Sequence, residues 1–320
     1  MRYLVTGGAG FIGSHLADAL LARGDEVVCV DNFNDYYSPA RKRRNIEGAL
    51  AQPGYTLVEA DIRDDAAIDA AFATYRPDKV AHIAAMGSIS YSVRNPKLYE
   101  EVNIRGTLNV LDATHRYAAR GVVLASTSSI YGRTDKIPFV ETDSTDRPLA
   151  PYPASKKADE VIAAAYNTSY GLPCICVRFF NVYGPRGRPD MTPYMFTDAI
   201  AHGRPITLYD SGRPRRDWTY VDDIIAGVIA ALDTDFSYEI FNLGRGQPVL
   251  MSDFVTIIER LVGKQAQIVD APLPSNEALV TYADVGKAHK LLGYDPQVSI
   301  EDGLGHFWAW YQAAVLGKQI

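Results

Sequence analysis

The sequence contains few cysteines, no long apolar run and no excess of basic residues. Its three cysteines, Cys29, Cys174 and Cys176, are too few and too odd in number for a disulfide framework. We therefore expect reduced thiols in the core, no metal site and a cytoplasmic protein. The longest apolar stretch, from Ile224 to Leu232, is far shorter than the roughly 20 residues that cross a bilayer. A net charge of −6, from 32 Lys and Arg against 38 Asp and Glu, predicts neither a nucleic acid nor a membrane surface as a partner.

Short apolar segments alternate with amphipathic ones through the first half of the chain. Such alternation builds right-handed βαβ units and a parallel sheet with helices on both faces. We therefore predict an α/β fold with a doubly wound parallel sheet, formed by residues 1–178 and about 218–244. Prolines and glycines crowd the region after Arg178, so residues 179–217 and 245–320 are assigned to a smaller C-terminal α/β lobe. Strands are predicted over 2–6, 26–31, 55–60, 79–84, 121–126 and 173–178, and helices over 11–23, 97–117, 159–170, 252–262, 284–292 and 300–314.

A glycine-rich turn connects the first strand to the first helix, with the sequence Gly7-Gly8-Ala9-Gly10-Phe11-Ile12-Gly13. Gly7 permits a tight turn, Gly10 lets the backbone approach a pyrophosphate, and Gly13 allows close packing of helix on strand. The phosphates then lie at the positive end of the helix that begins at Phe11 and Ile12. Glycines alone also mark ordinary turns, but here the strand before and the helix after them predict a Rossmann dinucleotide site.

Asp31 ends the second strand, 18 residues after Gly13. Its carboxylate is placed to accept hydrogen bonds from the adenosine ribose and would repel a 2′-phosphate, so NAD is favoured over NADP. The alternative is an aspartate that only caps a turn. The run Arg41-Lys42-Arg43-Arg44 offers a 2′-phosphate site in principle, but no basic residue directly follows Asp31. We expect this run to be a solvated helix start.

Tyr152 and Lys156 form a Tyr-x-x-x-Lys motif and are predicted to share one face of a helix. A lysine cation one turn away, together with a positive nicotinamide ring, favours the phenolate and makes the tyrosine a usable base near neutral pH. The spacing is common on amphipathic helices and becomes specific only beside the glycine-rich turn. Among the hydroxyls of residues 126–129, we choose Thr127 as the one that hydrogen-bonds the reacting oxygen.

These motifs together resemble the extended short-chain dehydrogenase/reductase family, and within it the nucleotide-sugar epimerases, over nearly the whole chain. The shared segments are the glycine-rich turn, Asp31-Asn32, Asp61-Ile62, His82-Ile83-Ala84-Ala85, the serine-rich residues 126–129, Tyr152 with Lys156, and Arg216-Asp217-Trp218-Thr219-Tyr220-Val221-Asp222-Asp223.

The resemblance implies roles for further residues. NAD is the expected cofactor, and Asp61 and Ile62 would hold its adenine. Asn32, Ala84, Ala85 and Asn103 complete the implied cofactor set, in which Ala84 packs on NAD and Asn103 supports the active site. A lone strand-end histidine, His82, is expected to be a satisfied core residue. The helical stretches 97–117 and 159–170 would form a four-helix interface with a second copy, which predicts a homodimer.

The resemblance also implies a UDP-sugar substrate, held mainly by the C-terminal lobe. Arg216 would neutralise its diphosphate, Glu277 would bind the uridine ribose, and Asn181 and Ser128 would lie near the sugar. Arg213, on the same loop as Arg216, is expected to be solvated. Enzymes of this family transfer a hydride from C4 of the sugar to NAD, and the resemblance implies that the Tyr152 phenolate takes the hydroxyl proton.

The resulting 4-keto sugar has three fates in this family. Dehydratases place an Asp-Glu pair directly after the catalytic hydroxyl, and decarboxylases tend to carry a Glu in the same stretch. Ser128 and Ser129 stand there in this chain, and neither supplies an acid or a base for elimination. We therefore expect epimerisation.

The sugar is suggested by residues 179–191, which resemble the same segment of UDP-glucuronate 4-epimerases. The resemblance implies that Arg188 pairs with the C6 carboxylate, for which a guanidinium gives bidentate, charge-assisted recognition. The segment Asn32-Phe33-Asn34-Asp35-Tyr36-Tyr37 matches as well. The alternative for Arg188 is a surface residue paired with Asp190. Ser90 stands where the family usually carries an arginine.

The predicted activity is NAD-dependent C4 epimerisation of UDP-glucuronate to UDP-galacturonate. A UDP-glucose 4-epimerase and a UDP-glucuronate decarboxylase of the same fold stay open. The alternative from another class is a non-catalytic regulator that senses NAD. Such proteins typically lack the tyrosine or the lysine of the motif, and both are present here.

Overall fold

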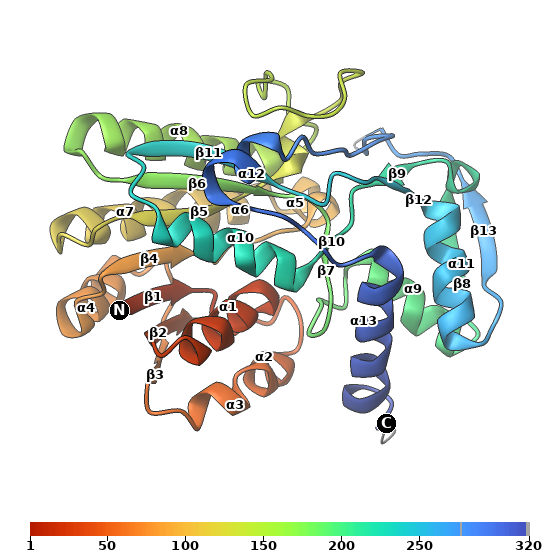
Figure 1. Ribbon diagram of the computed structural model, residues 1–320, viewed down its shortest axis with the longest axis horizontal. Coiled ribbons are helices and arrows are strands. Elements are labelled where there is room, and N and C mark those ends of the chain that lie inside the picture. Colours follow the sequence, from red (N-terminus) through yellow and green to blue (C-terminus); the bar gives the residue numbers. More distant parts are fainter. Residues whose placement is uncertain (276, 318–320) are drawn as a thin grey trace.

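A parallel sheet of seven strands forms the centre of the protein (Figure 1). The computed structural model describes residues 1–275 and 277–317. The strands lie in the order β11-β6-β5-β4-β1-β2-β3, and all neighbours pair in parallel. Their bounds are Arg2–Thr6 (β1), Glu26–Asp31 (β2), Tyr55–Glu59 (β3), Lys79–His82 (β4), Val122–Thr127 (β5), Cys174–Phe179 (β6) and Tyr238–Leu243 (β11).

Alternate residues of the strands face two separate apolar layers. Tyr3, Val5 and Cys29 belong to the layer on one face, and Leu4 and Val28 to the layer on the other. Both faces of the sheet are covered by helices, which confirms the doubly wound α/β fold. Helices α1 (Phe11–Ala22) and α10 (Val221–Asp233) pack on the first face, and α4 (Asp65–Tyr75), α7 (Gly106–Arg116) and α8 (Pro151–Tyr170) pack on the second.

Two predicted helices differ from those observed. The stretch 97–117 contains α6 (Pro96–Tyr99), a π-helical segment η1 (Glu100–Arg105) and α7. The helix predicted to begin at residue 159 begins at Pro151 instead. Proline is accepted in a first helical turn, because the N–H that it lacks has no partner within the helix there. As a result, Tyr152 and Lys156 lie on one helix, α8.

A smaller lobe is built from the segments that follow β6. The chain leaves the sheet after β6, builds the first part of the lobe, returns with α10 and β11, and then leaves again. The lobe strands pair as β7 with β10, β8 with β13, and β9 with β12. Its elements are β7 (Val182–Tyr183), α9 (Thr192–Ala201), β8 (Pro205–Tyr209), η3 (Asp210–Gly212), β9 (Arg215–Arg216), β10 (Thr219–Tyr220), β12 (Val249–Leu250), α11 (Met251–Val262), β13 (Gln267–Ala271) and α13 (Ile300–Ala314).

Several short elements complete the chain. Helix α12 (Gly286–Leu292) packs on β11 and α10, so a part of residues 245–320 lies against the sheet although we predicted it in the lobe. Around the sheet lie α2 (Pro39–Asn45), α3 (Glu47–Leu50), α5 (Ile89–Arg94) and the 3₁₀ turn η2 (Ser128–Tyr131). None of the helices in residues 1–275 and 277–317 is long and apolar enough to cross a membrane. In the same residues, no group of three or more His, Cys, Asp or Glu side chains is placed to hold a metal ion.

Candidate active site

A cavity of about 440 Å³ opens at the carboxyl ends of the parallel strands. It lies where the chain order in the sheet reverses between β4 and β1, which is the usual ligand position in open α/β sheets. The glycine-rich turn forms one side of the cavity, and residues 179–192 with Trp218 and Glu277 form the side that faces the lobe.

The glycine-rich turn has the close packing that its glycines predict. Gly7 has a φ of +67°, and its N–H donates to the carbonyl of Val30 over 2.7 Å. A Cβ on Gly13 would lie only 2.2 Å from the carbonyl oxygen of Gly7, so a side chain there would force the turn open. Helix α1 begins at Phe11 and has no side-chain cap, which leaves its first N–H groups for an anion. These features fit the pyrophosphate of a dinucleotide.

Asp31 lines the cavity and is buried beside the same turn. Its carboxylate accepts hydrogen bonds from the N–H of Ala9 over 3.2 Å and of Phe33 over 2.8 Å. Lys42 Nζ lies 3.9 Å from Asp31 and donates to Asn34 Oδ1 over 3.1 Å. Lys42 is only 4% exposed, so our prediction of a solvated basic run is wrong at this residue. The amphipathic turn of α2 points Lys42 inward, and burial lowers its pKa.

The residues expected around adenine follow β3. Asp61 and Ile62 line the cavity together with Asn32, whose Nδ2 donates to Asp61 Oδ2 over 2.9 Å. Hydrogen bonds from the Arg63 guanidinium are the main reason that the pKa of Asp61 falls to about 2. Asp61 therefore stays an ionised acceptor at neutral pH, next to the place that Asp31 assigns to the ribose.

Ala84 and Ala85 line the cavity, whereas Asn103 does not. The Asn103 side chain is fully buried, exchanges hydrogen bonds with the backbone of Met86 and donates to Ser155 Oγ. It therefore holds the wall of the cavity, not the cofactor directly. His82 is buried between the hydroxyls of Thr6 and Thr107, and burial lowers its pKa to about 3, as expected for a neutral core residue.

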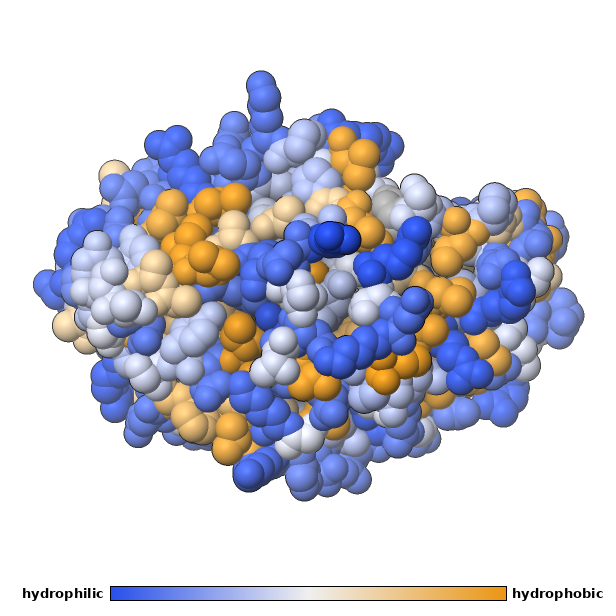
Figure 2. Space-filling model, turned by 90° about the horizontal axis from the view of Figure 1, so that it is seen from above, coloured by the Kyte–Doolittle hydropathy of each residue, from blue (hydrophilic) through white to orange (hydrophobic). Residues whose placement is uncertain are grey.

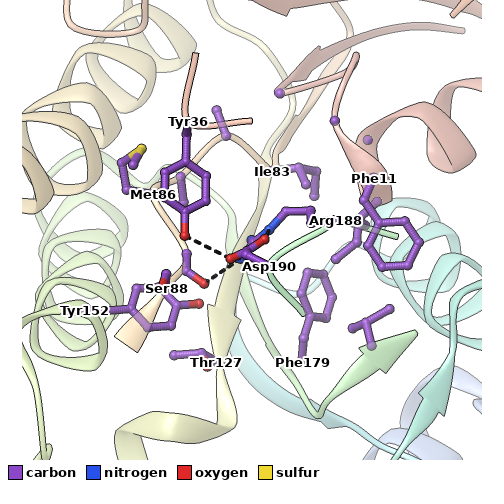
Figure 3. A pocket seen from close by; sticks show the side chains of 18 of the residues that line it. Phe11, Tyr36, Ile83, Met86, Ser88, Thr127, Tyr152, Phe179, Arg188 and Asp190 are labelled. Atoms are coloured by element: carbon purple, nitrogen blue, oxygen red, sulfur yellow. Dashed lines mark hydrogen bonds and ion pairs between the residues drawn. The ribbon is translucent and has the colours of Figure 1, made fainter. Parts of the chain in front are cut away.

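The predicted catalytic side chains come from β5 and α8. Tyr152 and Thr127 both line the cavity and point into it (Figure 3). Thr127 Oγ1 accepts a hydrogen bond from the N–H of Ser129, which leaves its own O–H to donate. Ser126 is unsuited to this role because its hydroxyl donates to the buried Glu160. Lys156 does not line the cavity; its ammonium is 2% exposed and donates to Asp159 over 2.6 Å.

Arg188 reaches the cavity from the loop after β7. Its Nε and Nη2 donate to the two oxygens of Asp190 over 3.0 and 2.8 Å, and Nη2 also donates to the carbonyl of Gly87. The pairing with Asp190 is therefore the alternative that we considered, although it lies in the cavity wall and not on the surface (Figure 3). Tyr36 Oη donates to the same carboxylate over 2.9 Å.

Gly87 brings this cation close to the catalytic tyrosine. A Cβ placed on Gly87 would lie 2.9 Å from Arg188 Nη1 and 4.0 Å from Tyr152 Oη. Both groups therefore face the same small space. The Nη1 atom faces it with no bond to Asp190, so this edge of the guanidinium has donors available in the cavity.

The lobe residues are only partly in the cavity. Ser128, Asn181 and Glu277 line it, whereas Arg216 on β9 does not and instead donates to Glu277 over 3.2 Å. Asn181 Oδ1 accepts from Thr281 Oγ1. Arg213 is exposed and pairs with Asp210, as expected for a solvated residue.

Sequence reasoning missed several residues of the cavity. Tyr37, Met86 and Asp190 line it, as do Tyr36 and Lys42. The two tyrosines belong to the segment 32–37, where a pair of aromatic residues five and six positions after Asp31 was an available signal. Asp190, two residues after Arg188, was weighed only as a surface partner.

Comparisons with known proteins support the interpretation of this cavity as an NAD-dependent active site. Residues 3–244 match the model of the NAD dependent epimerase/dehydratase family. A UDP-glucuronate 4-epimerase of Thermodesulfobacterium geofontis is 41% identical over 309 residues, which cover 96% of this chain and 95% of the relative. The structure of a UDP-glucuronic acid 4-epimerase from Bacillus cereus with UDP-glucuronic acid and NAD superposes with a TM-score of 0.93 at 32% identity, covering 98% of this chain and all of the other.

A structure with a different sugar specificity is nearly as similar. The NAD complex of the Thermus thermophilus UDP-glucose 4-epimerase gives a TM-score of 0.89 at 34% identity, covering 98% of this chain and all of the other. The backbone similarity therefore supports membership of the family and binding of NAD. It is nearly the same for the two sugar specificities and does not separate them. The chain belongs to the NAD-dependent epimerase/dehydratase family, and its cofactor is NAD.

Proposed function

We propose that the protein catalyses the C4 epimerisation of UDP-glucuronate to UDP-galacturonate through a 4-keto intermediate. The observation that carries the proposal is the position of Arg188, whose Nη1 faces the same space as Tyr152 Oη above Gly87. A cation beside the reacting hydroxyl suits a sugar that carries a carboxylate on C6, close to C4. The relatives that are named as UDP-glucuronate 4-epimerases add support.

The chain's residues provide the acid–base chemistry and the positioning. NAD, which the glycine-rich turn and Asp31 would hold, would supply the hydride transfer from and to C4 of the sugar. Tyr152, as the phenolate, takes the proton of the C4 hydroxyl and gives it back when the hydride returns. Thr127 donates a hydrogen bond to the same oxygen. Gly7, Gly10 and Gly13 let the backbone and the start of α1 hold the pyrophosphate.

The residues after Thr127 support epimerisation over elimination. Ser128 and Ser129 line the cavity at the positions where a dehydratase needs an acid and a base. A hydroxyl side chain does neither task near neutral pH. The 4-keto sugar is therefore expected to rotate and be reduced on its other face.

One observation favours a second candidate, epimerisation of a neutral UDP-hexose. Asp190 already takes the Nε and Nη2 edge of Arg188, so much of the cationic charge is balanced within the protein. Ser90, which lines the cavity, replaces an arginine that the acid-sugar enzymes usually carry. A pocket with balanced charge accepts a neutral sugar at less cost.

Identifying the reaction product shows which UDP-sugar the protein acts on and which reaction it catalyses. We expect purified protein, without added NAD, to convert UDP-glucuronate to UDP-galacturonate, as followed by proton NMR of the sugar anomeric signals. UDP-glucose, incubated in parallel, is expected to react at least about tenfold more slowly, since one charged hydrogen bond is worth about 1.5–3 kcal/mol. Faster turnover of UDP-glucose would replace the proposal by the second candidate, and a UDP-pentose product would replace it by decarboxylation.

We also propose that the protein is a homodimer through α7 and α8. Helix α8 exposes Ala154, Val161 and Ala165, which lie seven and four residues apart on one face. Val161 is 56% exposed. Figure 2 shows apolar side chains gathered at the left of the molecule, the end at which α7 and α8 lie in Figure 1. Small apolar residues in this pattern let two helix pairs pack closely.

Light scattering at micromolar concentration is expected to give twice the 35.2 kDa of one chain. Val161→Asp places like charges across the two-fold axis and is expected to give monomers. Ile268→Asp, at a residue of β13 that is 51% exposed, is the matched control and is expected to stay dimeric. A monomeric mass for the unmodified protein would contradict the proposal.

A further inference from the structure

A buried carboxylate lies directly beside the predicted catalytic lysine. Asp159 follows Lys156 by three residues on α8, and both side chains are only 2% exposed. Lys156 Nζ donates to Asp159 Oδ2 over 2.6 Å, whereas Oδ1 accepts no hydrogen bond from the described residues. Burial raises the pKa of Asp159, and the Lys156 ammonium and the Thr107 hydroxyl oppose this rise. A charged carboxylate is kept in such a place only by a cation, and Lys156 is that cation.

The other charges near this pair are matched elsewhere. Glu160 accepts two hydrogen bonds of 2.8 Å from Arg178 on β6, and Ser126 Oγ donates to it as well. The ammonium of Lys157, 29% exposed, lies 3.8 Å from the same Glu160 carboxylate. Asp159 is therefore the carboxylate that pairs with Lys156.

Two further titratable groups face Lys156 from the sheet, and both are neutral near pH 7. Burial, and to a smaller extent the Lys156 cation, lower the pKa of His82 on β4 to about 3. Burial raises the pKa of Cys176 on β6 well above its ordinary value. Neither group therefore replaces Asp159 as the negative charge beside Lys156.

We propose that Asp159 is a positioning residue, which holds the Lys156 ammonium one helical turn from Tyr152 and sets the pH at which Tyr152 and Lys156 together give up a proton. The proposal rests on the proposed catalytic roles of those two residues. A lysine side chain is long and flexible, and the buried contact with Asp159 restricts it. An ammonium has three N–H donors, so the bond to Asp159 leaves two for other partners.

The sign of the effect follows from charge alone. Tyr152 and Lys156 lie one helical turn apart, so a charge beside Lys156 also acts on Tyr152. The negative charge of Asp159 favours the protonated form of the pair, whichever of the two carries the proton. Its removal therefore lowers the pH at which the pair ionises. At an effective dielectric constant of about 20, one charge about 6 Å away shifts such an equilibrium by about two pH units.

The test is the pH dependence of Asp159→Asn, which removes the charge and nearly keeps the shape. We expect the acid limb of kcat to move about two pH units lower than in the unmodified NAD-loaded protein. The ultraviolet absorbance of tyrosinate, with Tyr152→Phe as the blank, is expected to show the same shift without any substrate. Asp235→Asn is the matched control, because Asp235 is 99% exposed and lies 3.6 Å from another lysine, Lys79. It is expected to shift neither measurement.

The two measurements separate this proposal from the proposed function. A shifted tyrosinate titration supports the proposal even if UDP-glucuronate is not turned over. An unshifted titration in a folded, NAD-bound Asp159→Asn protein overturns it, whatever the substrate. Because Asp159 is buried, thermal melting is measured first. Asp159→Gly, which leaves room for water, takes the place of the asparagine variant if that variant does not fold, and the same shift is expected.

Discussion

Replacing Tyr152 with phenylalanine is expected to lower kcat for epimerisation about 10³-fold while NAD stays bound. General acid–base groups typically contribute 10²- to 10⁴-fold to the rate, which sets the size of the expected loss. The phenyl ring keeps its packing, since the Tyr152 ring meets that of Tyr99 at a centroid distance of 6.0 Å. The loss is therefore expected in the chemical step and not in the fold.

The measurement is turnover of UDP-glucuronate together with the NAD content of the purified protein. Tyr170→Phe is the matched control, because Tyr170 ends the same helix and is 55% exposed. It is expected to retain the activity of the unmodified protein. A Tyr152→Phe protein within tenfold of that activity would remove Tyr152 from the mechanism.

Replacing Arg188 with methionine is expected to lower kcat/KM for UDP-glucuronate about 10²-fold, with little change for UDP-glucose. The charged hydrogen bond that Nη1 would donate to the carboxylate, at about 1.5–3 kcal/mol, accounts for a loss of this size. Methionine keeps the length of the side chain and loses the charge. The same variant is expected to release UDP-pentose, because the carboxylate of the 4-keto acid is then free to align with the carbonyl group.

The loss of the ion pair between Arg188 and Asp190 needs its own control in this experiment. Arg188→Met leaves the Asp190 carboxylate with Tyr36 as its remaining side-chain partner in the described structure, and a partly buried charge that loses its cation is itself destabilising. The double variant Arg188→Met/Asp190→Asn removes both charges and is expected to show the same change in selectivity. Arg213→Met, at an exposed arginine, controls for loss of charge alone. Equal losses for both sugars would refute recognition of the carboxylate by Arg188.

Local signals predicted the cofactor half of the fold well. The strand β1, the glycine-rich turn and α1 are contiguous, so residue types and spacing were enough to place them. The strands β7, β9, β10 and β12 were not predicted, because each has only two residues and a period of two leaves no pattern in so short a segment. Contacts between distant segments stabilise them, and these contacts are not visible along the chain.

The sequence predicted which residues form the site but not which side chains bind one another. Tyr152, Thr127 and Arg188 do line one cavity. Lys42 and Asp159 were missed for a common reason: a charged residue in a helix is normally solvated, and only the tertiary structure turns these two inward. Asn103 and Arg216 were assigned to ligands, whereas in the structure their hydrogen bonds go to other protein groups.

The return of the chain to the sheet after the lobe has a consequence for dissecting the molecule. The strand β11 covers the outer side of β6 only because residues 238–243 come back across the sheet. A fragment that ends at Phe179 would lack β11, so the backbone N–H and C=O groups on the outer side of β6 would be unpaired. It would also lack α10, so the apolar face of β6 that packs on this helix would be exposed. Such edges recruit other chains. The dinucleotide half is thus not a separable module, and truncation would yield aggregates in place of a minimal NAD carrier.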